Sequence, residues 1–399
     1  MFDLIKKYSK EILILLFSVI LALMFFYIAF INRPEYGLLS SEIDFNAENQ
    51  SEVLDTDLSL IFADKYFYLQ LTDDEQAEFQ SIYCQVKNFA PDVTVNKVSP
   101  ELMQKYIRIL CFDCPELFYL SESGHSYKQD HGVVISYRPA YLCSEDEALI
   151  KKGEISRVLT TIMRNIGETS EQNAEKFIHD YLVSNVSYSQ TTENCRNIYG
   201  ALVEGKANCR GYSTAFSYLC RSCGIECAEV VGYASVSDGN KVAHSWNVVK
   251  IGNYYYYTDV CWDDYDEKIS SVIGVQGCYV FYNLPTLMMK ASHDPTETIT
   301  TIGPLPSDNN ESLIFYKQTG QLVDNADDLG TSVAKQLRRV YSNDTNIILV
   351  QSMDDNTYKY AYDNIVKMVT QLSEEKGYDF TGCKLVELGG NALLLYGFE

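Results

Sequence analysis

Apolar residues that recur at helical spacing between Asn208 and Gly224 predict a helix. After Cys209 the apolar side chains follow at steps of three and four residues: Tyr212, Phe216, Leu219, Cys220 and Cys223. Asn208 suits the N-cap of this helix, and Gly224 suits the position just after its last turn. Cys209 then falls in the first turn, where unpaired N–H groups and the helix dipole favour a thiolate over a thiol.

Two strands joined by a tight turn follow this helix. Ala243–Ile251 and Tyr254–Cys261 are rich in β-branched and aromatic residues, and Gly252–Asn253 between them is typical of a two-residue hairpin turn. The register of that hairpin makes His244 and Asp259 diagonal neighbours on one face of the sheet. A carboxylate in this place can orient an imidazole, which can reach a thiol on a helix packed across the face. The candidate catalytic residues are therefore Cys209, His244 and Asp259.

Several short motifs around these residues resemble one known family. In chain order they are Ile178–Val183, Tyr199–Val203, Cys209–Tyr212, Gly224–Cys227, His244–Asn247 and Asp259–Asp264. With them the segment from about 174 to 294 resembles the transglutaminase-like superfamily, a branch of the papain-like fold. Residues 60 to 170, with Asp113–Phe118, resemble the helical region before this domain in bacterial membrane-anchored members.

The resemblance implies an α+β fold, in which a helix bearing the cysteine packs on an antiparallel sheet bearing the histidine and the aspartate. It implies Cys209 as nucleophile, His244 as general base and acid, and Asp259 as the orienting group. Three positions depart from the usual pattern, because Cys261 stands where Thr is common, Ser245 where Ala is common and Cys114 where Asn is common. None of the three departures removes a group of the triad.

The expected reaction is attack of the Cys209 thiolate on an amide of a protein or peptide, a cell-wall peptide being one candidate, to give a thioester. Water as acceptor makes the protein a cysteine peptidase or deamidase, and an amine makes it a cross-linking transglutaminase. The triad is the same for both outcomes. Hydrolysis is favoured because water is always present and no amine channel is recognisable in the sequence. A non-catalytic cell-surface binding module on the same scaffold is the alternative from another class.

Other chemistry-bearing residues have simpler interpretations. His179 with Asp180 is interpreted as structural rather than as a second acid–base pair, and the two tryptophans, Trp246 and Trp262, as packing walls. Two Cys-x-x-Cys pairs, Cys111–Cys114 and Cys220–Cys223, leave a zinc site or a redox pair as weak alternatives. The twelve cysteines also allow disulfides, whose pairing the sequence does not reveal.

The net charge and the N-terminal sequence indicate which partners and which location are expected for the protein. A formal charge of −22 argues against a nucleic-acid partner. Neither a glycine loop for phosphate nor a calcium loop is present, so no cofactor and no metal are expected. Residues 12–31 form an apolar run that is long enough to span a bilayer, and lysines precede it. This favours a single-pass anchor, with the N-terminus in the cytoplasm and the catalytic domain outside, over a cleaved signal peptide.

The chain of 399 residues is expected to divide into five parts. These are a cytoplasmic stub and transmembrane anchor (1–31), an acidic linker (32–58), a mostly helical region (59–170), the catalytic domain (171–300) and a small α/β module (311–399). In the last part we expect strands at 313–316, 347–350, 384–388 and 392–396, with helices at 332–341 and 357–375. That order suits a two-layer module of ferredoxin-like type.

Overall fold

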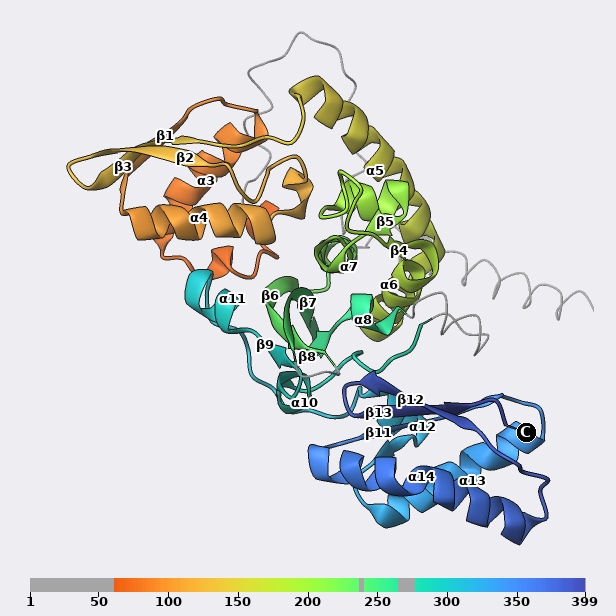
Figure 1. The fold of residues 1–399 in the computed structure, drawn as a ribbon. Helices are drawn as coiled ribbons and strands as arrows, with labels where there is room; N and C mark the ends of the chain where they lie inside the picture. The colour runs from red at the N-terminus through yellow and green to blue at the C-terminus, as the bar shows by residue number, and fades with distance from the viewer. Residues whose placement is uncertain (1–60, 237–239, 265–276, 399) are drawn as a thin grey trace, which may run out of the picture. The chain divides into compact units, whose positions relative to one another are not determined.

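The computed structural model describes residues 61–236, 240–264 and 277–398 (Figure 1). The predicted anchor at 12–31 and the acidic linker lie outside these residues. Within the described part of the chain, no helix combines the length and the apolar character that crossing a bilayer requires.

The first described region combines helices with a small sheet. Its elements are α3 (Asp73–Lys87), β1 (Val93–Val98), α4 (Pro100–Phe112), β2 (Ser126–Asp130), β3 (Val133–Arg138) and α5 (Glu145–Ile166). Helical patterns in the sequence predict helices at 73–86 and 100–111, and a run of β-branched residues predicts a strand at 133–137. The structure has all three. Helices make up most of the regular structure of this region. The three strands form an antiparallel sheet in the order β1-β3-β2, which the sequence did not predict. β2 is largely exposed and polar, so its sequence lacks a strong strand pattern.

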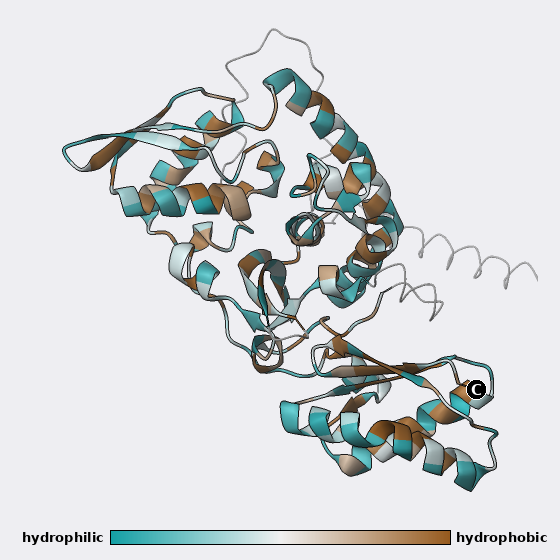
Figure 2. Cartoon of the chain, viewed as in Figure 1, coloured by the Kyte–Doolittle hydropathy of each residue, from teal (hydrophilic) through white to brown (hydrophobic). Residues whose placement is uncertain are grey.

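The C-terminal region is a two-layer α/β arrangement. Its elements are α12 (Phe315–Thr319), β10 (Leu322–Val323), α13 (Ala326–Tyr341), β11 (Ile347–Ser352), α14 (Asp355–Lys376), β12 (Lys384–Gly389) and β13 (Ala392–Tyr396). Most of β11 and β13 is buried, and the two strands are largely hydrophobic in Figure 2. Both predicted helices and the last three predicted strands are confirmed.

Two expectations for this region are wrong. Residues 313–316 do not form a strand, since Phe315 begins a short helix that ends at Gly320, a glycine with φ of 77°. The first strand is instead β10, which pairs in parallel with β11. The strand order β10-β11-β13-β12 therefore excludes a ferredoxin-like module.

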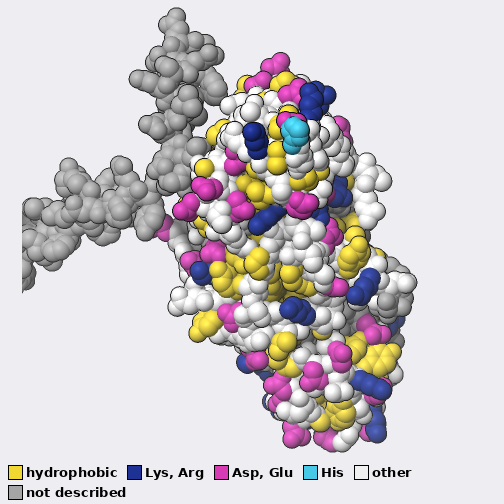
Figure 3. Space-filling model, turned by 90° about the vertical axis from the view of Figure 1, so that its left-hand side faces the viewer, with side chains coloured by type: hydrophobic (Ala, Val, Ile, Leu, Met, Phe, Trp, Pro, Cys, Tyr) yellow, Lys and Arg dark blue, Asp and Glu magenta, His cyan; other side chains and the backbone are white. Residues whose placement is uncertain are grey.

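Acidic side chains are spread over one face of the described part of the molecule (Figure 3). On the face that Figure 3 shows, they alternate with basic and hydrophobic side chains. This agrees with the scattered acidic residues of the sequence.

The central region holds the predicted catalytic helix and its sheet. It contains α6 (Glu171–Asn185), β4 (Ser187–Tyr188), β5 (Lys206–Ala207), α7 (Cys209–Ser222), β6 (Cys227–Ser235), β7 (Lys241–Ile251), β8 (Tyr254–Thr258), α8 (Val260–Asp263), α10 (Thr286–Lys290), β9 (His293–Asp294) and α11 (Thr296–Thr301). Strands β8-β7-β6-β9 form an antiparallel sheet, and α7 packs on β6 and β7.

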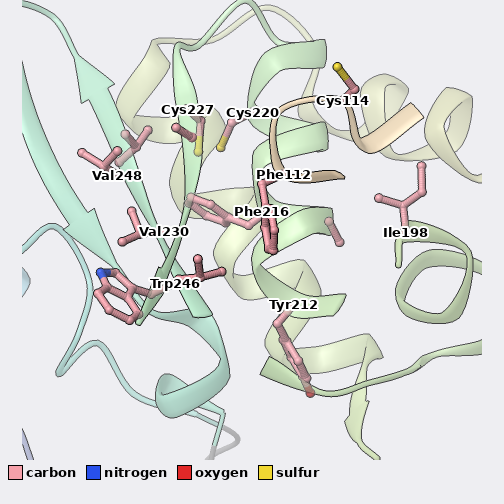
Figure 4. Close-up of a cluster of buried hydrophobic side chains, with 14 of the residues drawn as sticks. Phe112, Cys114, Ile198, Tyr212, Phe216, Cys220, Cys227, Val230, Trp246 and Val248 are labelled. Atoms are coloured by element: carbon pink, nitrogen blue, oxygen red, sulfur yellow. The ribbon is translucent and has the colours of Figure 1, made fainter. Parts of the chain in front are cut away.

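The core between α7 and this sheet is built from the predicted apolar face. Phe216 and Cys220 point from α7 toward Val230, Trp246 and Cys227 of the strands (Figure 4). All five side chains are buried. The close packing fixes the axis of α7 relative to β7, and with it the distance between the residues that the two elements carry.

The hairpin has the predicted turn and register, but its second strand is shorter than expected. Ile251 pairs with Tyr254 and Asn247 with Thr258, as the Gly252–Asn253 turn requires. β8 then ends, and Asp259 becomes the N-cap of α8 by accepting a hydrogen bond from the Trp262 N–H at 3.1 Å. The prediction of a strand as far as Cys261 is therefore wrong, because the aspartate caps a helix there.

Candidate active site

Cys209 is the first residue of α7, and the chain before it holds it in place. The Asn208 side chain accepts hydrogen bonds from the N–H groups of Arg210 and Gly211 at 3.1 and 3.2 Å. The Asn208 N–H donates to the Cys195 carbonyl at 2.8 Å. A Cβ atom at Gly211 would lie 2.3 Å from that carbonyl oxygen, so only glycine permits this close approach. The predicted cap and first-turn position of Cys209 are both confirmed.

His244 on β7 and Asp259 at the start of α8 form a short buried hydrogen bond. His244 Nε2 lies 2.6 Å from Asp259 Oδ2, and the two residues are 7% and 1% exposed. The second oxygen of the carboxylate caps α8 through the Trp262 N–H. Both oxygens of Asp259 therefore have fixed partners, which sets the orientation of the imidazole.

The third candidate, Cys209, meets the other side of the same ring. Burial lowers the pKa of His244, but the Asp259 charge and hydrogen bonds with Asp259 and Cys209 raise it to about 10. Because Asp259 occupies Nε2, the thiol faces Nδ1. Burial alone would raise the pKa of Asp259, yet the neighbouring His244 charge and hydrogen bonds hold it below its usual range. A charged imidazole thus lies between a carboxylate and the thiol at neutral pH.

A second histidine, His293, contacts the same carboxylate oxygen and was not singled out from the sequence. Its Nε2 lies 3.1 Å from Asp259 Oδ2, and its Nδ1 lies 2.8 Å from the Ser292 hydroxyl. Burial is the largest cause that lowers its pKa, so the ring is neutral and donates its Nε2 proton to Asp259. The pairing of β9 with β6 brings His293 to the site, and no sequence pattern close to His293 predicts this position.

These residues are also where the described part of the chain could hold a metal ion. The ligand atoms of His244, Asp259 and His293 all lie within 4.8 Å of one another. The two imidazole nitrogens, however, are at hydrogen-bond distance from one and the same oxygen. The hydrogen-bond network therefore uses the atoms that a metal would need.

Comparison with known proteins relates the central part of the chain to one family. Residues 160–260 match the family model of the transglutaminase-like superfamily. This segment is a transglutaminase-like domain. The search of curated proteins returned no match.

Three solved structures illustrate what the chain is similar to. One is a TGase, with 15% identity and a TM-score of 0.26, where the match covers 45% of this chain and 53% of that one. Another is a proposed cysteine protease from Cytophaga hutchinsonii, with 15% identity, a TM-score of 0.23 and coverage of 32% and 51%. A third is the periplasmic domain of TgpA from Pseudomonas aeruginosa, with 12% identity, a TM-score of 0.20 and coverage of 45% and 70%. The chain spans about half the length of the first two.

Aromatic rings enclose His244 and His293. The Trp262 ring lies 4.8 Å from the rings of both His244 and His293, and the buried Trp246 lies 4.8 Å from His293. Gly232 on β6 lets β9 approach closely, because a Cβ there would lie 2.0 Å from the Asp294 carbonyl oxygen. These contacts exclude bulk water from the imidazole pair and favour the packing interpretation of both tryptophans.

A buried polar network lies under the first turn of α7 in this domain. Glu229 accepts hydrogen bonds from the hydroxyls of Ser213 and Ser245 at 3.1 and 2.7 Å. Its carboxylate is 3.4 Å from the guanidinium of Arg210, which also pairs with Glu122. The departure from Ala to Ser at 245 thus adds a hydrogen bond to a buried carboxylate.

His179 belongs to a separate buried cluster of the transglutaminase-like domain. Its Nδ1 lies 3.1 Å from Asp180 and its Nε2 lies 3.1 Å from Asp263. Burial lowers its pKa, but these two hydrogen bonds raise it to about 9. Both nitrogens have carboxylate partners, so neither is available to a substrate. The contacts connect α6 with α8, which favours the structural interpretation.

All twelve cysteines lie among the described residues, and none of them forms a disulfide there. The buried Cys220 thiol contacts Cys227 across the α7–β6 interface, so it does not form a pair with Cys223. Cys261 is close enough to Cys209 for their charges to interact. Burial is the main cause that raises the Cys261 pKa, and this thiol is a natural control for the nucleophile.

Proposed function

We propose that this protein is a thiol acyl-transfer enzyme that acts on protein or peptide amides, with hydrolysis as its main outcome. Cys209 is the nucleophile, His244 the base and acid, and Asp259 the orienting group. The observation that carries the proposal is the position of His244, 2.6 Å from Asp259 on one side and hydrogen-bonded to the Cys209 thiol on the other. Acyl transfer by a thiol requires a nucleophile, a base and an orienting group in this order.

The reaction begins with the Cys209 thiolate and the His244 imidazolium. Sulfur attacks the amide carbon, and the carbonyl oxygen becomes an oxyanion. Because Asn208 caps the N–H groups of Arg210 and Gly211, the Cys209 N–H is the helix-start donor left for this oxyanion. His244 Nδ1 then gives its proton to the leaving amine, the C–N bond breaks and a thioester remains. The same nitrogen takes a proton from water, which attacks the thioester and releases a carboxylic acid and Cys209.

His293 contributes to this proposal as a positioning residue. It donates to the oxygen of Asp259 that faces His244, and therefore helps to hold the carboxylate in place. The proposal also includes attachment to a membrane through residues 12–31, with the enzyme on the outer side. What supports this part is the length and the charge pattern of the apolar run alone.

Thiol labelling followed by product analysis tests the proposal. Iodoacetamide should label Cys209 faster than the other thiols of the folded protein at neutral pH, because a paired thiolate reacts where a buried thiol does not. Cys209→Ser should abolish activity, whereas Cys261→Ser, at a thiol close to the nucleophile, should preserve it. Equal labelling of Cys209 and the remaining thiols, or activity that survives in Cys209→Ser, contradicts the proposal.

Mass spectrometry of a glutamine-containing protein mixture, with and without an added amine, separates the outcomes. Shortened peptides identify a peptidase, and a gain of about one mass unit at glutamine identifies a deamidase. Hydrolysis is expected even when the amine is present. A predominant amine adduct would instead identify a transglutaminase, with the same three residues in the same roles.

A further inference from the structure

A cavity of about 450 Å³ lies at the end of α7 that is distant from Cys209. It is bounded by α3, α5, the C-terminal end of α7 and a 3-10 turn, η3 (Pro115–Leu117). Tyr218 and Arg221 line it from α7, and at about 1.5 Å per residue they are roughly 14–18 Å along the helix from Cys209. Its volume falls in the range of about 300–1,000 Å³ that small-molecule sites occupy. The cavity is therefore a second concave site, separate from the catalytic residues.

The lining of this cavity is positive although the whole chain carries −22. Four cations line it, Lys65, Lys87, Lys152 and Arg221, against two carboxylates, Asp64 and Glu116.

Two of the four cations are neutralised within the protein. Lys65 lies 2.8 Å from Glu116, and Arg221 lies 2.6 Å from Asp113 behind the cavity wall. Lys65, Arg221 and Asp113 are buried, whereas Glu116 is partly exposed. Of the remaining charges of the lining, two are lysines, Lys87 and Lys152, and one is a carboxylate, Asp64, so the balance stays positive.

Lys87 and Lys152 make no ion pair with any residue of the described ranges 61–236, 240–264 and 277–398. The ammonium group of Lys152 lies 4.7 Å from the centre of the Tyr119 ring. Burial lowers the pKa of Lys152 and the charge of Lys87 lowers it further, while the charges of Glu145 and Glu116 partly oppose the shift. Two like charges thus face one cavity, one of them half-buried, and an anion between them would relieve both the repulsion and the lost hydration.

Three tyrosines are among the residues that line the cavity. Tyr83 and Tyr218 line it together with Tyr119. The Tyr83 hydroxyl donates to Glu116 at 2.9 Å, and the Tyr119 hydroxyl donates to the Lys87 carbonyl at 3.3 Å. Tyr83 and Tyr119 are each 1% exposed, and Phe89 stacks on the Tyr119 ring, so the partly exposed Tyr218 is the tyrosine that can pack against a planar group.

We propose that this cavity binds a small organic anion, with a phosphate or carboxylate group held between Lys87 and Lys152 and a flat apolar body against Tyr218. The site does not depend on the proposed acyl transfer, since it shares no residue with the triad.

Isothermal titration of the full-length protein with phenyl phosphate tests the proposal. The double variant Lys87→Gln/Lys152→Gln keeps the side-chain lengths and removes both charges. Its affinity should fall about tenfold or more, because each lysine contributes a charge-assisted hydrogen bond. The matched control is Lys359→Gln/Lys367→Gln, which removes two exposed charges from α14 and should bind as the wild type does. Without ligand, the cavity variant should melt no lower than the wild type, since the removed charges repel each other.

Two further probes identify the source of the anion. Dihexanoyl phosphatidic acid presents the same phosphate on a lipid, and phenol presents the ring without a charge. If phenyl phosphate binds more tightly, the result supports a soluble ligand; if the lipid binds more tightly, it supports a lipid headgroup. In both cases the binding must weaken in the variant that lacks the two lysines. Absence of saturable binding for both phosphates, equal affinity in the cavity variant, or equal binding of phenol overturns the proposal. The single variant Lys152→Gln, measured in parallel, gives the same answer if the double variant does not fold.

Discussion

The charge of one imidazole, His244, depends on one carboxylate, Asp259. The pKa of His244 is raised to about 10, with burial opposing and Asp259 favouring the charged ring. The imidazolium that protonates the leaving amine is therefore present below this value and is lost as the pH rises through it. We predict that kcat/KM falls on the alkaline side only near pH 10.

Asp259→Asn tests this dependence directly. The alkaline limb of kcat/KM should move down toward the ordinary imidazole pKa of about 6.5, and the rate should fall by about 10²–10⁴-fold. Asp264→Asn is the control, because that carboxylate accepts from the Tyr212 hydroxyl and does not contact His244. An unchanged alkaline limb in Asp259→Asn would show that another group sets the charge of His244.

His293 is the second residue whose effect can be isolated. Its hydrogen bond to a charged carboxylate is expected to contribute about 1.5–3 kcal/mol to holding Asp259 in place. We predict that His293→Leu lowers kcat about tenfold or more while KM changes little, and that His293→Gln, which keeps a donor, recovers part of the loss. Equal losses in the two variants would assign His293 to packing alone.

At the scale of single elements, the start of α7 depends on a glycine. Gly211→Ala places a Cβ 2.3 Å from the Cys195 carbonyl oxygen and 2.7 Å from the Ala207 side chain, so the helix start or the loop before it must move. We predict a loss of about 1–3 kcal/mol in unfolding free energy and a larger relative loss of activity, because Cys209 moves with the helix start. Urea unfolding and kcat/KM of the same preparation check both.

Gly153→Ala is the matched control for that substitution. Gly153 lies on an exposed position of α5 with open space around its Cα, and the same added methyl should stabilise the protein by about 0.5–1 kcal/mol. If both variants behave alike, the close contact at Gly211 is not what positions Cys209.

The elements around the site were predictable to the extent that their signals are local. The Asn208 cap, the apolar face of α7 and the Gly252–Asn253 turn each lie within a few residues, and the structure has all three. The end of β8 was not predictable, because Asp259 fits a strand and a helix N-cap equally well and only the bond from the Trp262 N–H decides.

Signals that depend on distant strands were missed. His293 reaches the site because β9 adds to the far edge of β6, a pairing between segments that are about sixty residues apart. The incorrect strand prediction at 313–316 has a local cause. A short apolar run is compatible with a strand and equally with a buried turn of helix.

At the scale of the whole molecule, buried ionisable groups connect folding to pH. Glu175 on α6 is fully buried and accepts hydrogen bonds from the Tyr282 hydroxyl and the Asn283 side chain, both at 2.9 Å. Burial raises its pKa from 4.5 to about 7, although these hydrogen bonds oppose the rise. Because the contacts join segments that are distant in the chain, unfolding must expose the carboxyl group.

The native state therefore holds a proton that the unfolded chain has already released between pH 4.5 and about 7. Stability due to this proton is fully present below the unfolded pKa and is lost as the pH rises through the folded one. We predict that the free energy of unfolding falls across this window, by on the order of 2–3 kcal/mol from Glu175. Glu175→Gln has no proton to lose, so urea unfolding at a series of pH values should give a flatter profile, whereas Glu374→Gln on the exposed side of α14 should keep the wild-type slope. An identical slope in Glu175→Gln and the wild type would mean that Glu175 stays ionised in the folded protein throughout this range.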